Sequence, residues 1–261
     1  MRRMHEGITL MKALIITVAG TSSRFSKSLG HNELKCIYSE PGSSIKETLL
    51  YRLLEFGSNF DKIVVVGGYR FGELKQYISE VVPKTISQKI EPIKNPYFTD
   101  RGSGWSLHLA VEALKNESVH SVVFAEGDLY FDEKSFRAAF ESSKDVITCN
   151  NNIIDAEKSV IFYCDKEMHP HYIYDTSHGA IEIKEPFTKI YNSGQVWRFA
   201  NPDRLFLLDE ELPDEVHSRT NLELINAYFS SEEIDELDIV EFQSWMNCNT
   251  VDDYRKAFMP S

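Results

Sequence analysis

The chain has 261 residues, 42% of them hydrophobic, which is enough for one large domain or two small ones. Its formal net charge is −12 without a visible basic cluster, which argues against a nucleic-acid partner. The longest apolar runs are much too short for membrane insertion. The four cysteines include no C-x-x-C pair, so we expect buried free thiols in a cytoplasmic protein, not structural zinc or disulfides.

The N-terminal region predicts a short tail followed by a strand. Arg2 and Arg3 precede the apolar run 13–19, an arrangement that imitates a signal peptide, but Lys12 interrupts it. The same run is typical of the first strand of an α/β domain. We therefore expect a tail at 1–11 and one domain at 12–261.

The first half of the chain alternates strands with helices. The predicted strands are 12–18, 61–68, 89–94, 120–128 and 145–150, and the predicted helices are 45–56, 71–82, 105–116 and 133–143. This alternation predicts βαβ units and a mainly parallel sheet. Ligands bind at the carboxyl ends of such strands. Because Gly20, Gly67, Gly68 and Asp128 follow predicted strands, we expect them at one rim.

The second half, from about 151, has a different pattern. Short strands with tight turns are predicted at 157–165, 171–175, 179–184 and 192–199, followed by helices at 202–209 and 221–229, a strand at 236–242 and a helix at 250–258. Thr250 is a suitable N-cap for the last helix. The prediction is an α/β fold with a Rossmann-like, mixed but mainly parallel sheet flanked by helices, and a smaller antiparallel portion in the second half.

The loop after the first strand, "AGTSSRF" at 19–25, is a candidate phosphate-binding loop. It matches neither the P-loop nor the dinucleotide fingerprint. Its small residues would let backbone amides approach phosphate oxygens, and Arg24 can form a forked pair with a phosphate. Lys27 and Lys35 add cations downstream. An ordinary loop with a surface arginine explains the segment equally well.

Carboxylates end the strand at 120–128. Glu126 and Asp128 offer the oxygen ligands that a nucleotide-bound divalent cation prefers. Alone, this segment is more typical of a strand-end turn, and its position opposite the Arg24 loop favours the metal site.

Two further segments carry candidate polar groups. Ser103 and Ser106 lie where a Gly- and Ser-rich loop enters a helix, and they can contact a base or sugar, although Ser103 can equally be a helix cap. His169 and His171 can chelate a metal, but without matching ligands nearby we expect exposed loop histidines.

Together these residues resemble the nucleotidylyltransferase family of the GT-A-like α/β fold. The shared pattern is a strand, A-G-x-x-x-R-F at 19–25, a lysine at Lys35, and a strand that ends in Gly127-Asp128. The chain is most similar to bacterial choline-phosphate cytidylyltransferases. The resemblance includes Asn95 before Ser106-Leu107, Ser193-Gly194 before Trp197, and "NCNTVDDYRKA" at 247–257.

The resemblance implies transfer of CMP from CTP to a small phosphorylated acceptor with release of pyrophosphate, in surface or capsular polysaccharide decoration. Mg²⁺ is the implied cofactor. The nucleotide half would be about 12–150 and the acceptor half about 151–261. The implied catalytic residues are Arg24, Lys35 and Asp128, and the implied metal ligands are Asp128 and Asn249. The implied nucleotide-binding residues are Ala19, Gly20, Thr21, Ser22, Ser23, Gly68, Ser103 and Ser106. The implied acceptor-binding residues are Glu126, Tyr130, Lys189, Trp197 and Asn247.

One departure concerns the acceptor. Asn247 and Asn249 stand where the similar enzymes carry E-x-D carboxylates, and neutral amides do not offset a quaternary ammonium. A phosphorylated amino acid, its amide or an aminoalkylphosphonate is then an alternative to phosphocholine. A sugar-1-phosphate nucleotidylyltransferase, a glycosyltransferase and a non-catalytic nucleotide-binding homologue stay open. The sequence does not predict the oligomeric state.

Overall fold

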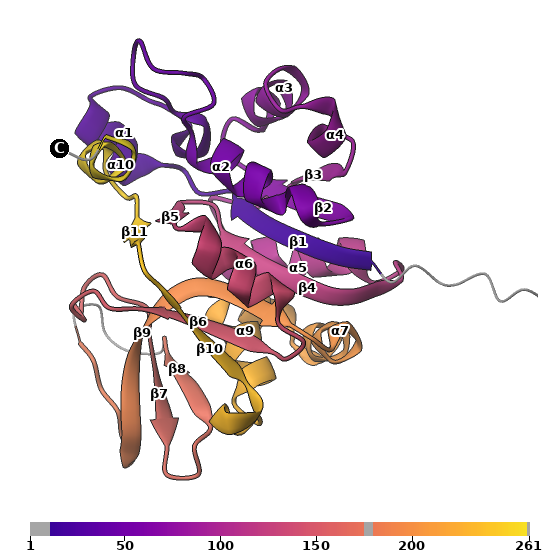
Figure 1. Cartoon of the computed structure of the whole chain (residues 1–261), viewed down its shortest axis with the longest axis vertical. Helices are drawn as coiled ribbons and strands as arrows, with labels where there is room; N and C mark the ends of the chain where they lie inside the picture. The colour runs from indigo at the N-terminus through magenta and orange to yellow at the C-terminus, as the bar shows by residue number, and fades with distance from the viewer. Residues whose placement is uncertain (1–10, 175–179, 260–261) are drawn as a thin grey trace, which may run out of the picture.

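The computed structural model describes residues 11–174 and 180–259, and Figure 1 shows their path. The main sheet has the order β10-β6-β9-β4-β1-β2-β3, with β7 and β8 attached through β9. Its strands are β1 (Met11–Val18), β2 (Lys62–Gly67), β3 (Ile90–Lys94), β4 (Val119–Glu126), β6 (Val146–Asn150), β7 (Ile161–Asp165), β8 (Pro170–Ile173), β9 (Phe187–Phe199) and β10 (Asp238–Phe242). β1 pairs in parallel with β2 and β4, which confirms the predicted core of the sheet.

The antiparallel portion is also confirmed. β9 runs antiparallel to β4 and β6 and continues outward to pair with β7. β7 and β8 form a hairpin at the far end of this extension (Figure 1). A separate antiparallel pair, β5 (Leu129–Phe131) with β11 (Trp245–Asn247), joins the C-terminal segment to the turn after β4. Residues near 247 and near 128 are thereby held side by side.

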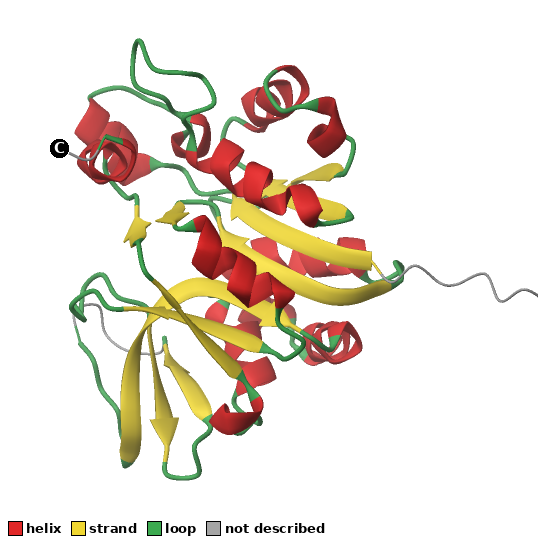
Figure 2. Cartoon of the chain, viewed as in Figure 1, coloured by secondary structure: helices red, strands yellow, loops and turns green. Residues whose placement is uncertain are grey.

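Helices cover both faces of the sheet, as Figure 2 shows. They are α1 (Ser23–Leu29), α2 (Leu49–Phe56), α3 (Phe71–Glu80), α4 (Lys84–Ser87), α5 (Ser103–Leu114), α6 (Glu133–Glu141), α7 (Pro202–Glu211), α8 (Asp214–His217), α9 (Leu222–Phe229) and α10 (Val251–Phe258), with short 3-10 turns η1 (Lys35–Ile37), η2 (Gly57–Asn59) and η3 (Ile234–Glu236). None of the helices in the described ranges has both the length and the apolar character that a bilayer crossing requires.

Strand β1 is buried on both sides because its apolar run is continuous. Ala13 and Ile15 pack into the core cluster with helices α5, α7 and α9, while Leu14 and Ile16 pack into the cluster with α2, α3 and α6. Successive side chains of a strand point to opposite faces, so a central parallel strand needs apolar residues at every position. The four cysteines are buried and free, as predicted.

Several predicted elements differ in the structure, among them β7, which begins at Ile161 and not at 157. The helix predicted at 45–56 begins at Leu49, because the Thr48 side chain accepts a hydrogen bond from Tyr51 N and caps it, while Ile45 is 60% exposed. Residues 180–184 form no strand, because they lack a buried face; Gly179 lies outside the described residues. β9 instead begins at Phe187, five residues before the prediction, since its first part pairs with β7.

The prediction for the last helix is confirmed. The Thr250 side chain accepts a hydrogen bond from Asp253 N, and Asp253 accepts one from Thr250 N, which forms a capping box. Helix α10 packs on α1 through Val251 and Tyr254, which join Phe25 in one buried cluster. The C-terminal segment therefore closes against the helix that follows the β1 loop.

Candidate active site

A cavity of about 420 Å³ lies at the carboxyl ends of β1 and β4. It brings together most of the residues predicted for a nucleotide and a metal. Of the predicted site residues, those lining it are Ala19, Gly20, Thr21, Ser22, Ser23, Arg24, Lys35, Ser103, Ser106, Glu126, Asp128 and Asn249. The parallel arrangement of β1 and β4 accounts for this, because it directs both strand ends to the same edge of the sheet.

The loop after β1 forms one wall. Ser22 adopts a left-handed backbone conformation with φ of 55° and stands at the N-cap of α1. Its side chain accepts a hydrogen bond from Lys35 N at 3.2 Å, which ties the loop to η1. Gly20 borders open space, so a ligand can approach its backbone. The exposed Arg24 side chain forms no ion pair with any described residue and is available to an anion.

Lys35 and Asp128 form an ion pair in the lining of the cavity. Lys35 Nζ lies 2.9 Å from Asp128 Oδ2, and both side chains are largely buried. Asp128 occupies the turn between β4 and β5, where its backbone oxygen accepts a hydrogen bond from Cys248 N. Its second carboxylate oxygen, Oδ1, is buried and accepts no hydrogen bond from the described residues. This oxygen, together with Asn249, which also lines the cavity, fits the donor set of a hard divalent cation.

Glu126 stands beside this pair at the end of β4. Burial, and next the charge of Asp128, raise the pKa of Glu126 to about 7. The Asn221 side chain donates a hydrogen bond to Glu126 Oε1 at 2.6 Å, and Asn221 N donates to Ser103 Oγ at 3.1 Å. Asn221 was predicted only as the start of a helix, so the sequence reasoning missed its contact with the site.

The segment before α5 contributes a second residue that the sequence reasoning missed. Arg101 lines the cavity, and its guanidinium lies 3.6 Å from the centre of the Trp105 ring. Gly102 N donates to Ser218 O, and a Cβ atom at Gly102 would lie 1.9 Å from Arg219 O. The close approach requires glycine here, and it fixes the loop 218–221 against the entrance of α5.

The structure does not bring five of the predicted residues into this cavity lining. Gly68 packs against Phe98, Tyr130 stacks under Arg52, and Lys189 covers the Tyr191 ring in the β7–β9 extension. Asn247 lies in β11 with its Oδ1 buried and unpartnered among the described residues. Trp197 is fully buried, stacks on Phe124 and donates to the Tyr172 hydroxyl, so it cannot reach a ligand.

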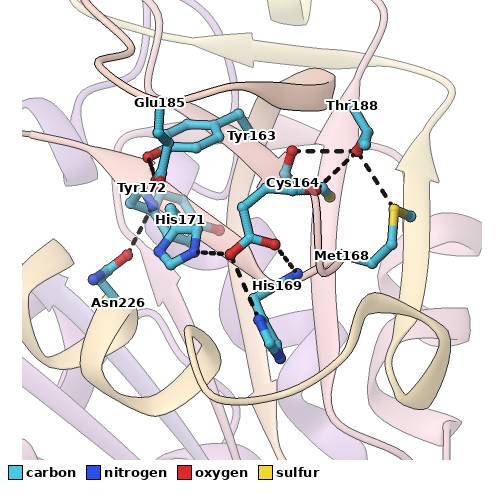
Figure 3. Close-up of polar contacts among 10 residues, drawn as sticks. Tyr163, Cys164, Met168, His169, His171, Tyr172, Glu185, Thr188 and Asn226 are labelled. Carbon is cyan, nitrogen blue, oxygen red and sulfur yellow. Dashed lines mark hydrogen bonds and ion pairs between the residues drawn. The ribbon is translucent and has the colours of Figure 1, made fainter.

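The histidine pair of the second half is not an exposed loop pair. His171 lies in β8 with Nε2 2.8 Å from Asp165 Oδ2, and His169 Nδ1 lies 3.5 Å from the same oxygen. Figure 3 labels both histidines. His169 N donates to Asp165 Oδ1 at 2.8 Å. Although burial opposes ionisation, these contacts hold the pKa of Asp165 below its usual value. Asp165 thus has partners for both oxygens within its own hairpin.

Three solved structures with the same fold are described as nucleotidyltransferases. The inositol-1-phosphate CTP transferase from T. maritima is 14% identical with a TM-score of 0.65, covering 93% of this chain and 91% of the other. The CTP:phosphocholine cytidylyltransferase from Streptococcus pneumoniae is 15% identical, with a TM-score of 0.64 and coverage of 95% and 97%. A putative glucose-1-phosphate thymidylyltransferase from Bacillus anthracis is 14% identical, with a TM-score of 0.65 and coverage of 95% and 94%. At these identities the likeness establishes the fold.

The sequence comparison assigns the family. The model of a domain of unknown function, DUF6564, matches residues 31–260, and the chain therefore belongs to that family. No curated protein sequence matches the chain significantly. The matched region begins after β1 and the Arg24 loop.

Proposed function

We propose that the protein is a nucleotidyltransferase that transfers CMP from CTP to a small phosphorylated acceptor and releases pyrophosphate. The observation that carries the proposal is the single cavity in which Arg24, Lys35 and Asp128 converge at the carboxyl ends of β1 and β4. Two of the structures with this fold are described as CTP-dependent enzymes acting on inositol-1-phosphate and phosphocholine, which supports both the reaction and the nucleotide.

The reaction needs little covalent chemistry from the protein. An oxygen of the acceptor phosphate attacks the α-phosphorus of the nucleotide, the bond to the bridging oxygen breaks, and pyrophosphate leaves with that electron pair. Because the nucleophile is already an anion, no general base is required. The protein then contributes in-line positioning and neutralisation of phosphate charge.

Each wall of the cavity has a role in this mechanism. The backbone of residues 19–23 would cradle the triphosphate, and Arg24 would pair with a phosphate through its fork of donors. Lys35 would exchange its 2.9 Å contact with Asp128 for the phosphates once a cation occupies Asp128. Mg²⁺ held by Asp128 and Asn249 would add Lewis-acid charge neutralisation when bound.

Two groups in the cavity lining suit an acceptor that is less cationic than phosphocholine. Asn249 offers a neutral amide and Arg101 offers a positive charge, and neither attracts a quaternary ammonium group. A phosphorylated amino acid or its amide suits such groups better, since amides and guanidinium donate hydrogen bonds to carboxylate or carbonyl oxygens. A role in surface polysaccharide decoration stays a prediction of the family resemblance.

Pyrophosphate release tests the proposal. The purified chain is incubated with CTP, UTP, dTTP or GTP and with phosphocholine, a phosphorylated amino acid, its amide, an aminoalkylphosphonate or a sugar-1-phosphate, with Asp128→Asn as the negative control. Turnover with CTP and an acceptor of the proposed class supports the function. Turnover with sugar-1-phosphates alone reassigns the acceptor, and nucleotide binding without turnover on any acceptor makes the chain a binding protein.

A further inference from the structure

A second group of side chains that can bind a metal joins helices α5, α7 and α8, and it does not include Asp128. His108 lies in α5, Asp209 in α7 and His217 at the end of α8. One ligand-capable atom from each of the three lies within 4.8 Å of the other two, the one such group of three or more found among the described residues. Asp209 and His217 are buried, and the His108 side chain is 20% exposed.

The hydrogen bonds of His217 leave two lone pairs facing each other. His217 Nε2 lies 3.0 Å from the backbone oxygen of Asp209, and a carbonyl can only accept, so Nε2 carries the proton. In the neutral ring Nδ1 is then an acceptor, and it lies 3.8 Å from Asp209 Oδ1. That buried oxygen accepts no hydrogen bond from the described residues. Two buried acceptors in this position are stabilised by a positive charge between them.

The spacing suits a metal ion. Zinc binds imidazole nitrogen and carboxylate oxygen at about 2.0–2.2 Å each, so the 3.8 Å separation is slightly below the sum of two such bonds and requires a bent N–Zn–O angle. The His108 and His217 rings lie 4.2 Å apart, centre to centre. His108 Nδ1 lies 3.0 Å from Asp209 Oδ2, and any proton that it shares with that oxygen would leave when the ion binds. Because His108 is partly exposed, it gives an ion access from solvent.

We propose that His108, Asp209 and His217 form a Zn²⁺ site with a solvent molecule as the fourth ligand. Two imidazoles and one carboxylate are a donor set that suits this ion. The ion would join α5, α7 and α8. It would thereby hold the segment 217–221, whose Asn221 donates to Glu126 at 2.6 Å. The role is structural, at the back of the candidate active site.

The Asp165 hairpin provides a built-in comparison. It contains the same residue types, Asp165 with His169 and His171, but both Asp165 oxygens already have donors. Its carboxylate therefore needs no ion. A substitution at His171 therefore controls for loss of a histidine, and Asp128→Asn controls for metal binding in the nucleotide cavity.

Metal content and spectroscopy test the site in the full chain. Protein freed of metal by chelation is titrated with Zn²⁺ or with Co²⁺ as a spectroscopic probe, in excess Mg²⁺, and Zn²⁺ is counted after dialysis. We expect one equivalent of Zn²⁺, visible Co²⁺ bands typical of four-coordination, and a melting temperature raised by about 5 °C at saturation. His217→Gln and His108→Gln should weaken binding by at least about 10-fold, whereas His171→Gln and Asp128→Asn should bind as the wild type does.

Three outcomes would overturn the proposal: a wild-type chain that takes up no Zn²⁺, undiminished Zn²⁺ binding in the His108 and His217 variants, or loss of the ion in His171→Gln or Asp128→Asn. Circular dichroism of the metal-free variants shows whether each one folds. If buried His217→Gln does not fold, the partly exposed His108→Gln decides the question, and the Co²⁺ spectrum is its readout.

Discussion

Asn221 and Glu126 are 95 residues apart in the sequence, yet the Asn221 side chain donates a 2.6 Å hydrogen bond to Glu126 Oε1. The contact joins the N-terminus of α9 to the end of β4 and so links the two halves of the chain at the candidate site. It provides one neutral donor to a carboxyl group that also lies near the charge of Asp128. Burial and that charge raise the pKa of Glu126 to about 7, and the stability of the fold should depend on it.

The free energy of unfolding of the Glu126→Gln variant, relative to that of the wild type, should increase as the pH rises. In the folded chain Glu126 keeps its proton up to a pH of about 7, whereas in the unfolded chain the proton leaves near 4.5. The folded state therefore binds more protons between these values, and the wild type loses stability as pH rises through that window. Glutamine keeps the oxygen that accepts from Asn221. Urea unfolding should show the variant gaining on the order of 2 kcal/mol over the wild type between pH 4 and pH 8.

The surface variant Glu133→Gln is the matched control for this experiment. Glu133 lies in the first turn of α6, and its side chain is 57% exposed. Its stability difference from the wild type should change little over the same pH range. An equally flat difference for Glu126→Gln would show that the Glu126 carboxyl does not titrate as stated.

Arg24→Ala should raise the KM for nucleotide about tenfold and lower kcat, because the guanidinium faces phosphate charge both before and during the reaction. Lys27→Ala is the control, since Lys27 belongs to the same helix α1 but is not among the residues lining the candidate cavity. Steady-state pyrophosphate release measures both. Equal effects of the two substitutions would mean that net charge matters and that Arg24 has no specific place in the site.

Asp128→Asn should reduce kcat/KM by at least about 100-fold. The change weakens the oxygen ligand and removes the charge that holds Lys35 at 2.9 Å. Excess Mg²⁺ should restore activity only in part, because an amide is a poorer ligand for a hard cation. Rates measured over a range of Mg²⁺ concentrations decide the matter; full activity at low Mg²⁺ contradicts a metal role for Asp128.

Much of the fold follows from local sequence patterns. The continuous apolar run of β1 required burial on both faces, and the structure has Ala13 and Leu14 in separate core clusters. Arg24 and Asp128 follow strands whose parallel pairing could be predicted, so their meeting at one rim could be predicted too. The prediction of a strand at 180–184 was wrong. Alternating apolar and polar residues are typical of a half-buried strand, but the strand forms only where another part of the fold covers its apolar face.

The missed residues have a common physical origin. Asn221 and Arg101 reach the site from loops, and no periodicity in the sequence tells where a loop will be held. The loop carrying Asn221 is positioned by backbone contacts such as Gly102 N to Ser218 O. The sequence shows a glycine at 102, but it does not show that the backbone of residues 218 and 219 lies against this glycine.

Gly102→Ala should destabilise the chain by about 2 kcal/mol or more, because the new methyl group would lie 1.9 Å from Arg219 O and backbone cannot move aside cheaply. It should also raise KM, since the displaced loop carries Asn221. Gly72→Ala is the matched control, because the added methyl group would meet no atom within 4 Å beyond its chain neighbours and the nearby backbone of α3, and the helical position should gain up to about 1 kcal/mol. Thermal unfolding of both variants measures the difference. Similar melting temperatures would show that the loop can yield.

The last prediction concerns the two asparagines near the C-terminus. Asn249 lines the cavity, whereas Asn247 lies in β11 and is not part of that lining. Asn249→Asp should therefore lower the Mg²⁺ concentration needed for half-maximal rate, since an ionised oxygen is the better ligand, and Asn247→Glu should change it less. The wild type should use a phosphorylated amino acid or its amide better than phosphocholine, because asparagine amides donate hydrogen bonds that ionised carboxylates cannot.

Steady-state rates on both acceptors, for the wild type, each variant and the double variant, test this in one set of measurements. A wide wild-type preference for phosphocholine would contradict the acceptor argument while leaving the nucleotidyl transfer intact. If neither acceptor reacts until Asn247→Glu and Asn249→Asp are combined, the wild-type chain is an inactive homologue. The two carboxylates would then be needed to bind the metal tightly enough for turnover. If Asn249→Asp leaves the Mg²⁺ dependence unchanged, Asn249 is not a ligand, and the cation is held on the Asp128 side of the cavity alone.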